Sequence, residues 1–139
     1  MRVGSMPNQV TTLSVLKDAR MHEIYRKAAE ILGVRGMSKN LVYDPYTKQV
    51  DIMGALLLAC GASERLLAEG LTEPSDVGVP PVNQGKVLVA YEYVESALSE
   101  DPSEWCGKHK THEAAVLLVK LSDRIEISVR IPESIPQTN

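Results

Sequence analysis

The sequence predicts a mostly helical (α+β) fold: a small bundle of four to five helices with a short β-hairpin element and a C-terminal strand. Several segments repeat apolar residues at the spacing of a helix with one buried face. Two shorter segments instead carry β-favouring or alternating patterns. The core residues are almost all aliphatic, because the chain has no Phe and only one Trp. Such side chains suit packing between helices.

The chain length fits one domain, since 139 residues can bury a core of their own. We expect a flexible tail over residues 1–11, a single helical domain over residues 12–131 and a disordered tail over residues 132–139. Residues 71–86 are rich in Pro, Gly and acidic residues and form a surface loop. A domain boundary there would leave a C-terminal piece near the lower size limit for independent folding.

The first helix is predicted to begin near Thr12, because apolar residues recur from Leu13 to Leu32 at helical spacing. Gly33 is expected to end it in a left-handed cap. Residues 41–50 follow with the β-favouring run Leu41-Val42-Tyr43 and the turn-forming pair Asp44-Pro45. A small hairpin or an extended loop is expected there.

A buried central helix is expected over residues 51–60, which are apolar nearly all round. Asp51 is a suitable N-cap, and Gly54 would let another helix approach closely. About two further helical turns follow between Ser63 and Gly70. Cys60 is expected to behave as a small buried hydrophobic residue.

The next helix is predicted from Lys86 to Glu100. Its buried side is formed by Val87, Leu88, Tyr91, Val94, Ala97 and Leu98. Tyr91 and Tyr93 cannot both face inward on one helix, so one of them should be exposed. Asp101-Pro102 ends this helix, and a loop carrying Trp105 follows.

The last helix is expected to begin with Thr111 as its cap, with Glu113 near its positive end. The period then changes to two, because Ile125, Ile127, Val129 and Ile131 alternate with polar residues. This alternation predicts a strand, ended by Pro132, that pairs with residues 41–50 or with a second chain. The predicted core comprises Leu16, Ile24, Ile31, Leu56, Leu57, Val94, Leu98 and Leu118.

Three short stretches resemble a family of small uncharacterised domains found in actinomycetes and their phages. They are Ile31-Leu32-Gly33 at the end of a helix, Gly54-Ala55-Leu56 inside a buried helix, and Trp105 ahead of a helix capped by Thr111. The resemblance covers about residues 20–122. It implies a helix, a short irregular hairpin, a buried helix and a final capped helix, and it implies no activity.

The net charge of −3 argues against nucleic-acid binding, which normally requires a basic excess. Nucleic-acid binding is therefore only the alternative hypothesis, and the first helix would make the contact. Its basic residues and those that follow it are Arg20, Arg26, Lys27, Arg35 and Lys39. Acidic residues are interspersed among them, so a solvated helix face is the expected role. No signal peptide or membrane-spanning run is recognised, and a cytoplasmic location is expected.

Cys106, His109 and His112 form the third hypothesis, a metal-binding site, because thiolate and imidazole are zinc ligands. The spacings match no known zinc motif, and a fourth ligand would have to come from Cys60 or Glu113. Three neighbours on one loop also make a poor Cys–His catalytic pair. We therefore expect no catalytic residues, no metal and no other cofactor.

The leading hypothesis is a non-enzymatic protein that binds another protein or a second copy of itself, as a regulatory or phage-encoded accessory factor. Trp105, Tyr43 and Tyr46 are the candidate interaction surface, since exposed aromatic residues dominate protein contacts. Trp105 has a second role open to it, as an anchor of the last helix against the core.

Overall fold

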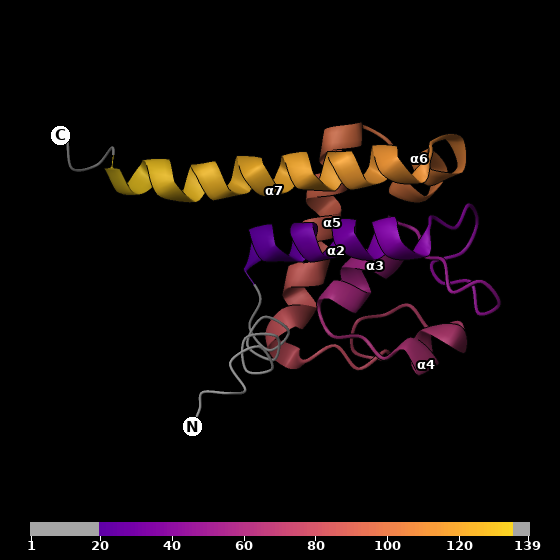
Figure 1. Cartoon of the computed structure of the whole chain (residues 1–139). Coiled ribbons are helices and arrows are strands. Elements are labelled where there is room, and N and C mark those ends of the chain that lie inside the picture. Colours follow the sequence, from indigo (N-terminus) through magenta and orange to yellow (C-terminus); the bar gives the residue numbers. More distant parts are fainter. Residues whose placement is uncertain (1–19, 135–139) are drawn as a thin grey trace, which may run out of the picture.

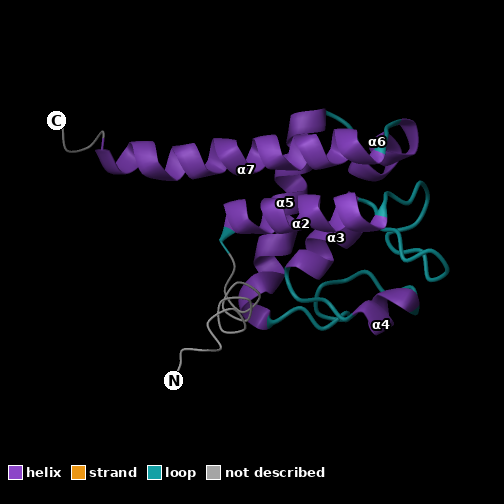
Figure 2. Ribbon diagram, in the orientation of Figure 1, coloured by secondary structure: helices purple, strands orange, loops and turns teal. Residues whose placement is uncertain are grey.

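Helices make up most of the protein. The computed structural model describes residues 20–134 and, of these, the side chains of residues 20–125. The helices within this range are α2 (Met21–Arg35), α3 (Ile52–Ala59), α4 (Glu64–Ala68), α5 (Pro81–Leu98), α6 (Pro102–Lys108) and α7 (Thr111–Ser134). Figure 2 shows them joined by loops, with no strand between residues 20 and 134. The predicted helical class is confirmed, whereas both β elements are wrong.

The longest helix, α7, lies antiparallel along α2 (Figure 1). The Ser122 hydroxyl donates to the carbonyl oxygen of His22 at 2.9 Å, and Arg26 forms an ion pair with Asp123 at 3.0 Å. At the opposite end of the pair, the Thr111 hydroxyl accepts from the backbone N–H of Met37 at 3.0 Å. These contacts fix the register of the two helices.

The central helix α3 packs against α2 and also contacts α5 and α6. Asp51 caps its N-terminus as predicted, since its carboxylate accepts from the backbone N–H of Gly54 at 2.9 Å. A Cβ added to Gly54 would overlap the carbonyl oxygen of Val42. The close neighbour of Gly54 is therefore the backbone of the preceding loop rather than another helix.

The core lies between these helices. Five of the predicted core residues are buried, namely Ile24, Leu56, Leu57, Val94 and Leu118. Ile31 and Leu98 lie at its edge and are partly buried, and Leu16 lies outside the described residues. Cys60 and Cys106 are both buried and free, so Cys60 packs as the small hydrophobic residue that was expected.

The end of α2 differs from the prediction. The helix continues through Gly33 to Arg35, and Gly36 ends it with a φ of 86°. The Gly36 N–H donates to the carbonyl oxygen of Leu32 at 2.8 Å. Gly36, not Gly33, has the positive φ that other residues adopt at a steric cost, and its extended ψ of 159° differs from the predicted left-handed cap. The predicted start at Thr12 lies outside the described residues.

The predicted hairpin is wrong, because residues 36–51 form a closed loop with two isolated bridges. Val50 forms one with Met37 and the other with Tyr43. The Asp44 carboxylate accepts from the backbone N–H groups of Tyr46 and Thr47, at 2.9 and 3.3 Å. Only one antiparallel residue pair, Tyr43 with Val50, forms across this turn. The continuous series of pairs that a β-hairpin needs is therefore absent from the loop.

The predicted C-terminal strand is also wrong, because α7 continues as a helix to Ser134. A helix satisfies its backbone hydrogen bonds locally, whereas a strand needs a partner. The expected partner, residues 41–50, already makes its backbone contacts within its own loop. The predicted pairing of this segment with residues 41–50 therefore does not occur.

Two more local predictions need correction. α5 begins at Pro81, five residues before Lys86, because Pro at the first helical position has its φ preset and needs no N–H partner. The loop expected around Trp105 forms the short helix α6, capped by Asp101. Thr111 does not cap α7 as expected, because its hydroxyl accepts from the backbone N–H of Met37. Glu113 lies in the first turn of α7 as predicted, and its carboxylate accepts from the backbone N–H of Lys110 at 2.7 Å.

Candidate functional site

The three aromatic residues of the predicted interaction surface have different environments. Tyr43 is buried, and its hydroxyl donates to the Glu64 carboxylate at 2.8 Å. Trp105 is partly buried and stacks on the ring of His109, with ring centroids 3.9 Å apart. Tyr46 is 93% exposed in the loop before α3. Of the three, Tyr46 alone presents an open aromatic ring.

Tyr43 belongs to a hydrogen-bonded group that joins α2 to α4. The Arg35 guanidinium donates twice to the Glu64 carboxylate, at 2.7 and 3.1 Å. The hydrogen bonds from Arg35 and Tyr43 lower the pKa of Glu64 to about 2. This group ties two helices to the intervening loop, and we assign it a structural role.

The structure separates the members of the predicted metal site. Cys106 is buried in α6, and burial raises the pKa of its thiol to about 11. His109 Nδ1 lies 2.8 Å from the carbonyl oxygen of Trp105, and His112 is exposed. Within the part of the chain described, no three His, Cys, Asp or Glu side chains are placed to hold a metal ion.

Three of the five basic residues proposed for nucleic-acid contact have partners inside the protein. Arg26 pairs with Asp123, and Arg35 pairs with Glu64. The Lys39 ammonium donates to the carbonyl oxygens of Cys106 and His109 at the end of α6. These three side chains hold elements of the fold together.

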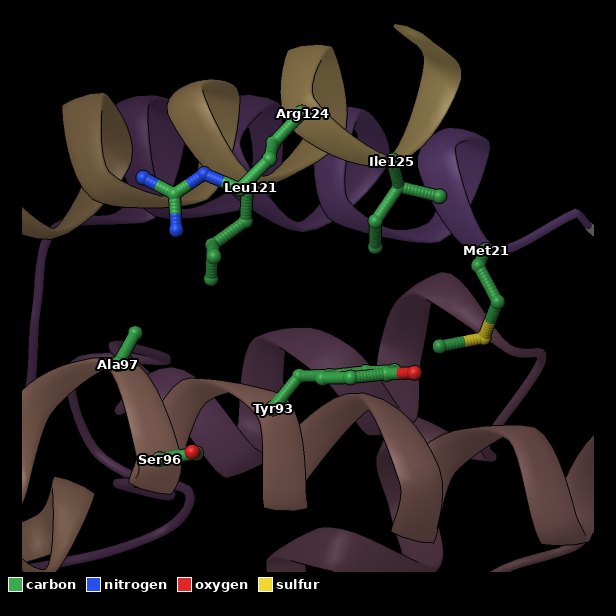
Figure 3. Close-up of a pocket in the computed structure, with 7 residues that line it drawn as sticks. All are labelled: Met21, Tyr93, Ser96, Ala97, Leu121, Arg124 and Ile125. Atoms are coloured by element: carbon green, nitrogen blue, oxygen red, sulfur yellow. The ribbon is translucent and has the colours of Figure 1, made fainter. Parts of the chain in front are cut away.

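A groove of about 640 Å³ lies between α5 and α7, beside the first residue of α2. Figure 3 shows Leu121 and Ile125 projecting from α7 toward Tyr93 on α5, with Met21 at one end. Ser96, Ala97 and Arg124 complete the lining. The groove is mostly apolar and has one cationic side chain.

The groove continues onto an exposed face of α5. Val82, Val89 and Tyr93 are 48%, 44% and 53% exposed. They are separated by seven and then four residues, which places them on one side of a helix. The adjacent side of α5 is buried through Asn83, Val87, Ala90 and Val94. α5 is therefore apolar on its outer side as well as its inner side.

Sequence reasoning missed this outer face. It placed Leu88 and Ala97 on the buried side, but Leu88 is exposed and Ala97 lines the groove. It did predict that one of Tyr91 and Tyr93 is exposed, and Tyr93 is that residue. The spacing of Val82, Val89 and Tyr93 was the available signal, once the helix is known to begin at Pro81.

A second apolar hollow lies over α2 and α7. Ala29, Ala115, Val116 and Val119 form its surface, and Arg26, Glu30 and Lys120 flank it. It has charges of both signs beside it and no exposed aromatic residue among its lining. The α5 groove therefore offers the better protein contact.

A polar site surrounds Asp51 where α3 meets α6. Burial raises the pKa of Asp51 to about 6, although the backbone N–H of Gly54 and the Ser103 side chain hydrogen-bond to its carboxylate. Lys39, Asn40 and Lys108 line the adjacent hollow. The carboxylate already has its hydrogen-bond partners within the protein, so we assign it the capping of α3.

Comparison with protein-family models, curated proteins and solved structures finds no match to the chain. The resemblance to actinomycete and phage domains stays a prediction. Among residues 20–134, no helix combines the length and apolar character needed to cross a membrane.

Proposed function

We propose that the protein is a non-enzymatic protein-binding domain whose contact surface is the outer face of α5 together with the groove between α5 and α7. The observation that carries this proposal is Tyr93. Tyr93 is 53% exposed and lies where the apolar face of α5 meets the groove. The α5 surface comprises Val82, Val89, Tyr93 and the groove lining of Ala97, Leu121 and Ile125.

The composition of the α5 surface supports protein binding. Tyrosine and arginine are enriched among the residues that dominate binding energy, and both Tyr93 and Arg124 line the groove. A groove between two helices accepts the apolar side of a third helix, with anchors every three or four residues. Leu121 and Ile125 project into the space where such anchors would lie (Figure 3).

The state of the thiols supports a non-enzymatic role. Burial raises the pKa of Cys60 to about 12 and that of Cys106 to about 11. At neutral pH both groups remain thiols, and the thiol form is a poor nucleophile. Free cysteines also fit the cytoplasmic location that we propose, since that compartment keeps thiols reduced.

Affinity capture from the native host with matched tyrosine variants tests the proposal. Tyr93→Ala removes the exposed ring of the α5 surface, and Tyr46→Ala removes an exposed ring in the loop before α3. We expect the wild-type protein and Tyr46→Ala to retain the same partner, and Tyr93→Ala to lose it. A partner held equally by all three proteins would contradict the proposal, and loss only with Tyr46→Ala would favour the surface predicted from sequence.

A further inference from the structure

One end of the groove between α5 and α7 is formed by Met21, the first residue of α2. Figure 3 shows the Met21 side chain directed toward the ring of Tyr93 at this end. The chain therefore enters α2 beside the groove, and residues 1–19 precede that point in the sequence. Any apolar side chain just before Met21 is held near the groove by the covalent chain itself.

The backbone at Arg20 departs from the helical conformation of α2. Arg20 is the N-cap, with a φ of −83° and a ψ of 155°, which is extended. Its backbone N–H donates to the Glu23 carboxylate at 3.0 Å, as in one half of a capping box. The cap marks the start of α2, so the direction of the preceding segment is not set by the axis of that helix.

The segment before Arg20 carries apolar side chains at a spacing that suits the groove. Val10, Leu13 and Leu16 recur every three residues. Anchors three or four residues apart are those with which a helix enters an apolar groove. The groove presents Leu121 and Ile125 to such anchors, so segment and groove match in apolar character.

The length of the segment also fits. The lining on α7 runs from Leu121 to Ile125, and four residues of helix rise about 6 Å. Leu16 lies five residues before Met21, and five residues of chain reach about 17 Å when extended. The tether is therefore long enough to place Leu16 along the groove. A short tether also gives an effective concentration on the order of millimolar, so modest contacts suffice to fill the groove.

Charge adds to this match. Arg124 brings a positive charge to the lining of the groove, and Asp18 is the only acidic residue among residues 1–19. Lys17 stands next to Asp18, but adjacent side chains point in different directions in both a helix and a strand. The segment can therefore present Asp18 to Arg124 while Lys17 is directed to solvent.

We propose that residues 10–19 of this chain occupy the groove between α5 and α7 and compete there with the partner of the α5 surface. The occupation rests on the groove and on the position of Met21, whereas the competition rests on the proposed function. Val82 and Val89 on the outer face of α5 are exposed and lie outside the groove. A partner therefore makes its first contact with that face and gains the groove by displacing the segment.

Disulfide trapping in the purified chain tests the occupation. Leu16→Cys is combined with Ala97→Cys in the groove or, as the matched control, with Val119→Cys. Val119 is exposed and lies two residues from Leu121, but it lines the other hollow, over α2 and α7. We expect mild oxidation to close the Leu16–Ala97 pair within one chain at least about tenfold faster than the control pair, because docking raises the local concentration of one thiol at the other. The native cysteines are buried and should not compete.

Equal rates for the two pairs would overturn the proposal, because an undocked segment meets both sites at similar rates. A disulfide that joins two chains would also overturn it and would place the segment in the groove of a second copy.

Nitration of tyrosine by tetranitromethane tests the occupation without a cross-link. Tyr93 lines the groove, whereas Tyr46 lies outside it and is 93% exposed, so Tyr46 serves as an internal reference. Leu13→Ser/Leu16→Ser removes two of the proposed anchors. We expect the nitration of Tyr93 relative to Tyr46 to rise several-fold in this double variant, because the groove is then uncovered.

Val3→Ser/Met6→Ser is the matched control for this measurement. It also removes two apolar side chains before Arg20, but these lie outside residues 10–19. The control should nitrate like the wild-type protein. The same relative nitration of Tyr93 in all three proteins would overturn the proposal.

Affinity capture with the same two double variants tests the competition separately. A partner that depends on Tyr93 should be retained several-fold more by Leu13→Ser/Leu16→Ser than by Val3→Ser/Met6→Ser. Equal retention would reject the competition, and trapping would still decide the occupation. Absence of any partner that depends on Tyr93 would reject the proposed function, whereas the results on the purified chain do not depend on that partner.

Discussion

The carbonyl oxygen of Val42 lies directly against Gly54, so closely that a Cβ on residue 54 would overlap it. The same oxygen accepts the backbone N–H of Asp51 at 3.3 Å. Besides the Asp51 side-chain cap, the loop of residues 36–51 is therefore held against the first turn of α3 by its backbone. Because backbone cannot move aside like a side chain, this position tolerates no residue other than glycine without rearrangement.

Gly54→Ala is expected to destabilise the protein by about 1–3 kcal/mol, the usual cost of overpacking a rigid site. Gly33→Ala is the control, since a Cβ at Gly33 meets no atom within 4 Å. That substitution should be neutral or stabilise α2 by up to about 1 kcal/mol. Urea unfolding followed by circular dichroism measures both. Equal midpoints for the two variants would mean that the loop does not lie against α3.

Glu64→Gln is expected to cost roughly 1 kcal/mol at neutral pH, because it weakens the contacts with Arg35 and Tyr43. The figure is discounted because the Glu64 side chain is 39% exposed. The folded protein lowers the pKa of Glu64 to about 2, so its contribution is present above the unfolded value near 4.3 and is lost as the pH falls toward 2.

Acid unfolding measures this contribution, and Glu69→Gln provides the control. Glu69 forms an exposed i,i+4 ion pair with Arg65, which contributes little to stability. The wild-type protein and Glu69→Gln should lose stability in parallel below pH 4.5, whereas Glu64→Gln should lose less over the same interval. A steeper acid loss in Glu64→Gln than in the wild type would show that Glu64 does not act through its charge.

The sequence predicted the parts of the fold that depend on local pattern. The helical spacing of α2 and the all-apolar α3 with its Asp51 cap were both recognised, and the structure confirms them. The alternation around Ile125 was misleading, because whether a strand forms depends on a partner that local pattern cannot supply. The loop at Val50 closes on itself instead, and α7 remains helical.

The functional surface was less predictable for a related reason. Glu64 lies 21 residues after Tyr43 and 29 residues after Arg35, the two residues that hydrogen-bond to it. Only the fold therefore shows that Tyr43 is buried and hydrogen-bonded. Similarly, Tyr93 becomes a candidate only when α7 is seen to pass beside α5 and leave a groove (Figure 3). The aromatic residues could be recognised as candidates from the sequence, but tertiary packing determines which of their side chains are exposed.

Asp51→Asn is expected to raise stability at pH 7 by up to roughly 3 kcal/mol and to flatten its pH dependence. Burial raises the pKa of Asp51 to about 6, above the unfolded value near 4. The folded state therefore disfavours the carboxylate, and this cost is full above pH 6 and disappears as the pH falls toward 4. Asparagine keeps the cap on the Gly54 N–H without the charge.

Thermal melting between pH 7.5 and pH 5 measures this difference. The wild-type protein should gain stability relative to Asp51→Asn as the pH falls, until the two curves approach each other below pH 5. The variant must first show an unchanged circular dichroism spectrum, which establishes that its helical content is retained. Parallel curves throughout the range would show that Asp51 is not a buried acid with a raised pKa.

The two thiols should be unreactive in the folded protein. Cys60 and Cys106 are fully buried, and their raised pKa values keep them protonated at pH 8. A thiol reagent reacts with the thiolate and needs access to the sulfur, so both requirements fail until the protein opens. We expect negligible labelling by Ellman's reagent under native conditions and two thiols per chain after unfolding in guanidinium. Because opening limits the rate, Gly54→Ala should label faster than wild type, and Gly33→Ala should not. Rapid native labelling of either cysteine, abolished by its change to serine, would reveal an accessible thiolate and reopen the question of catalysis.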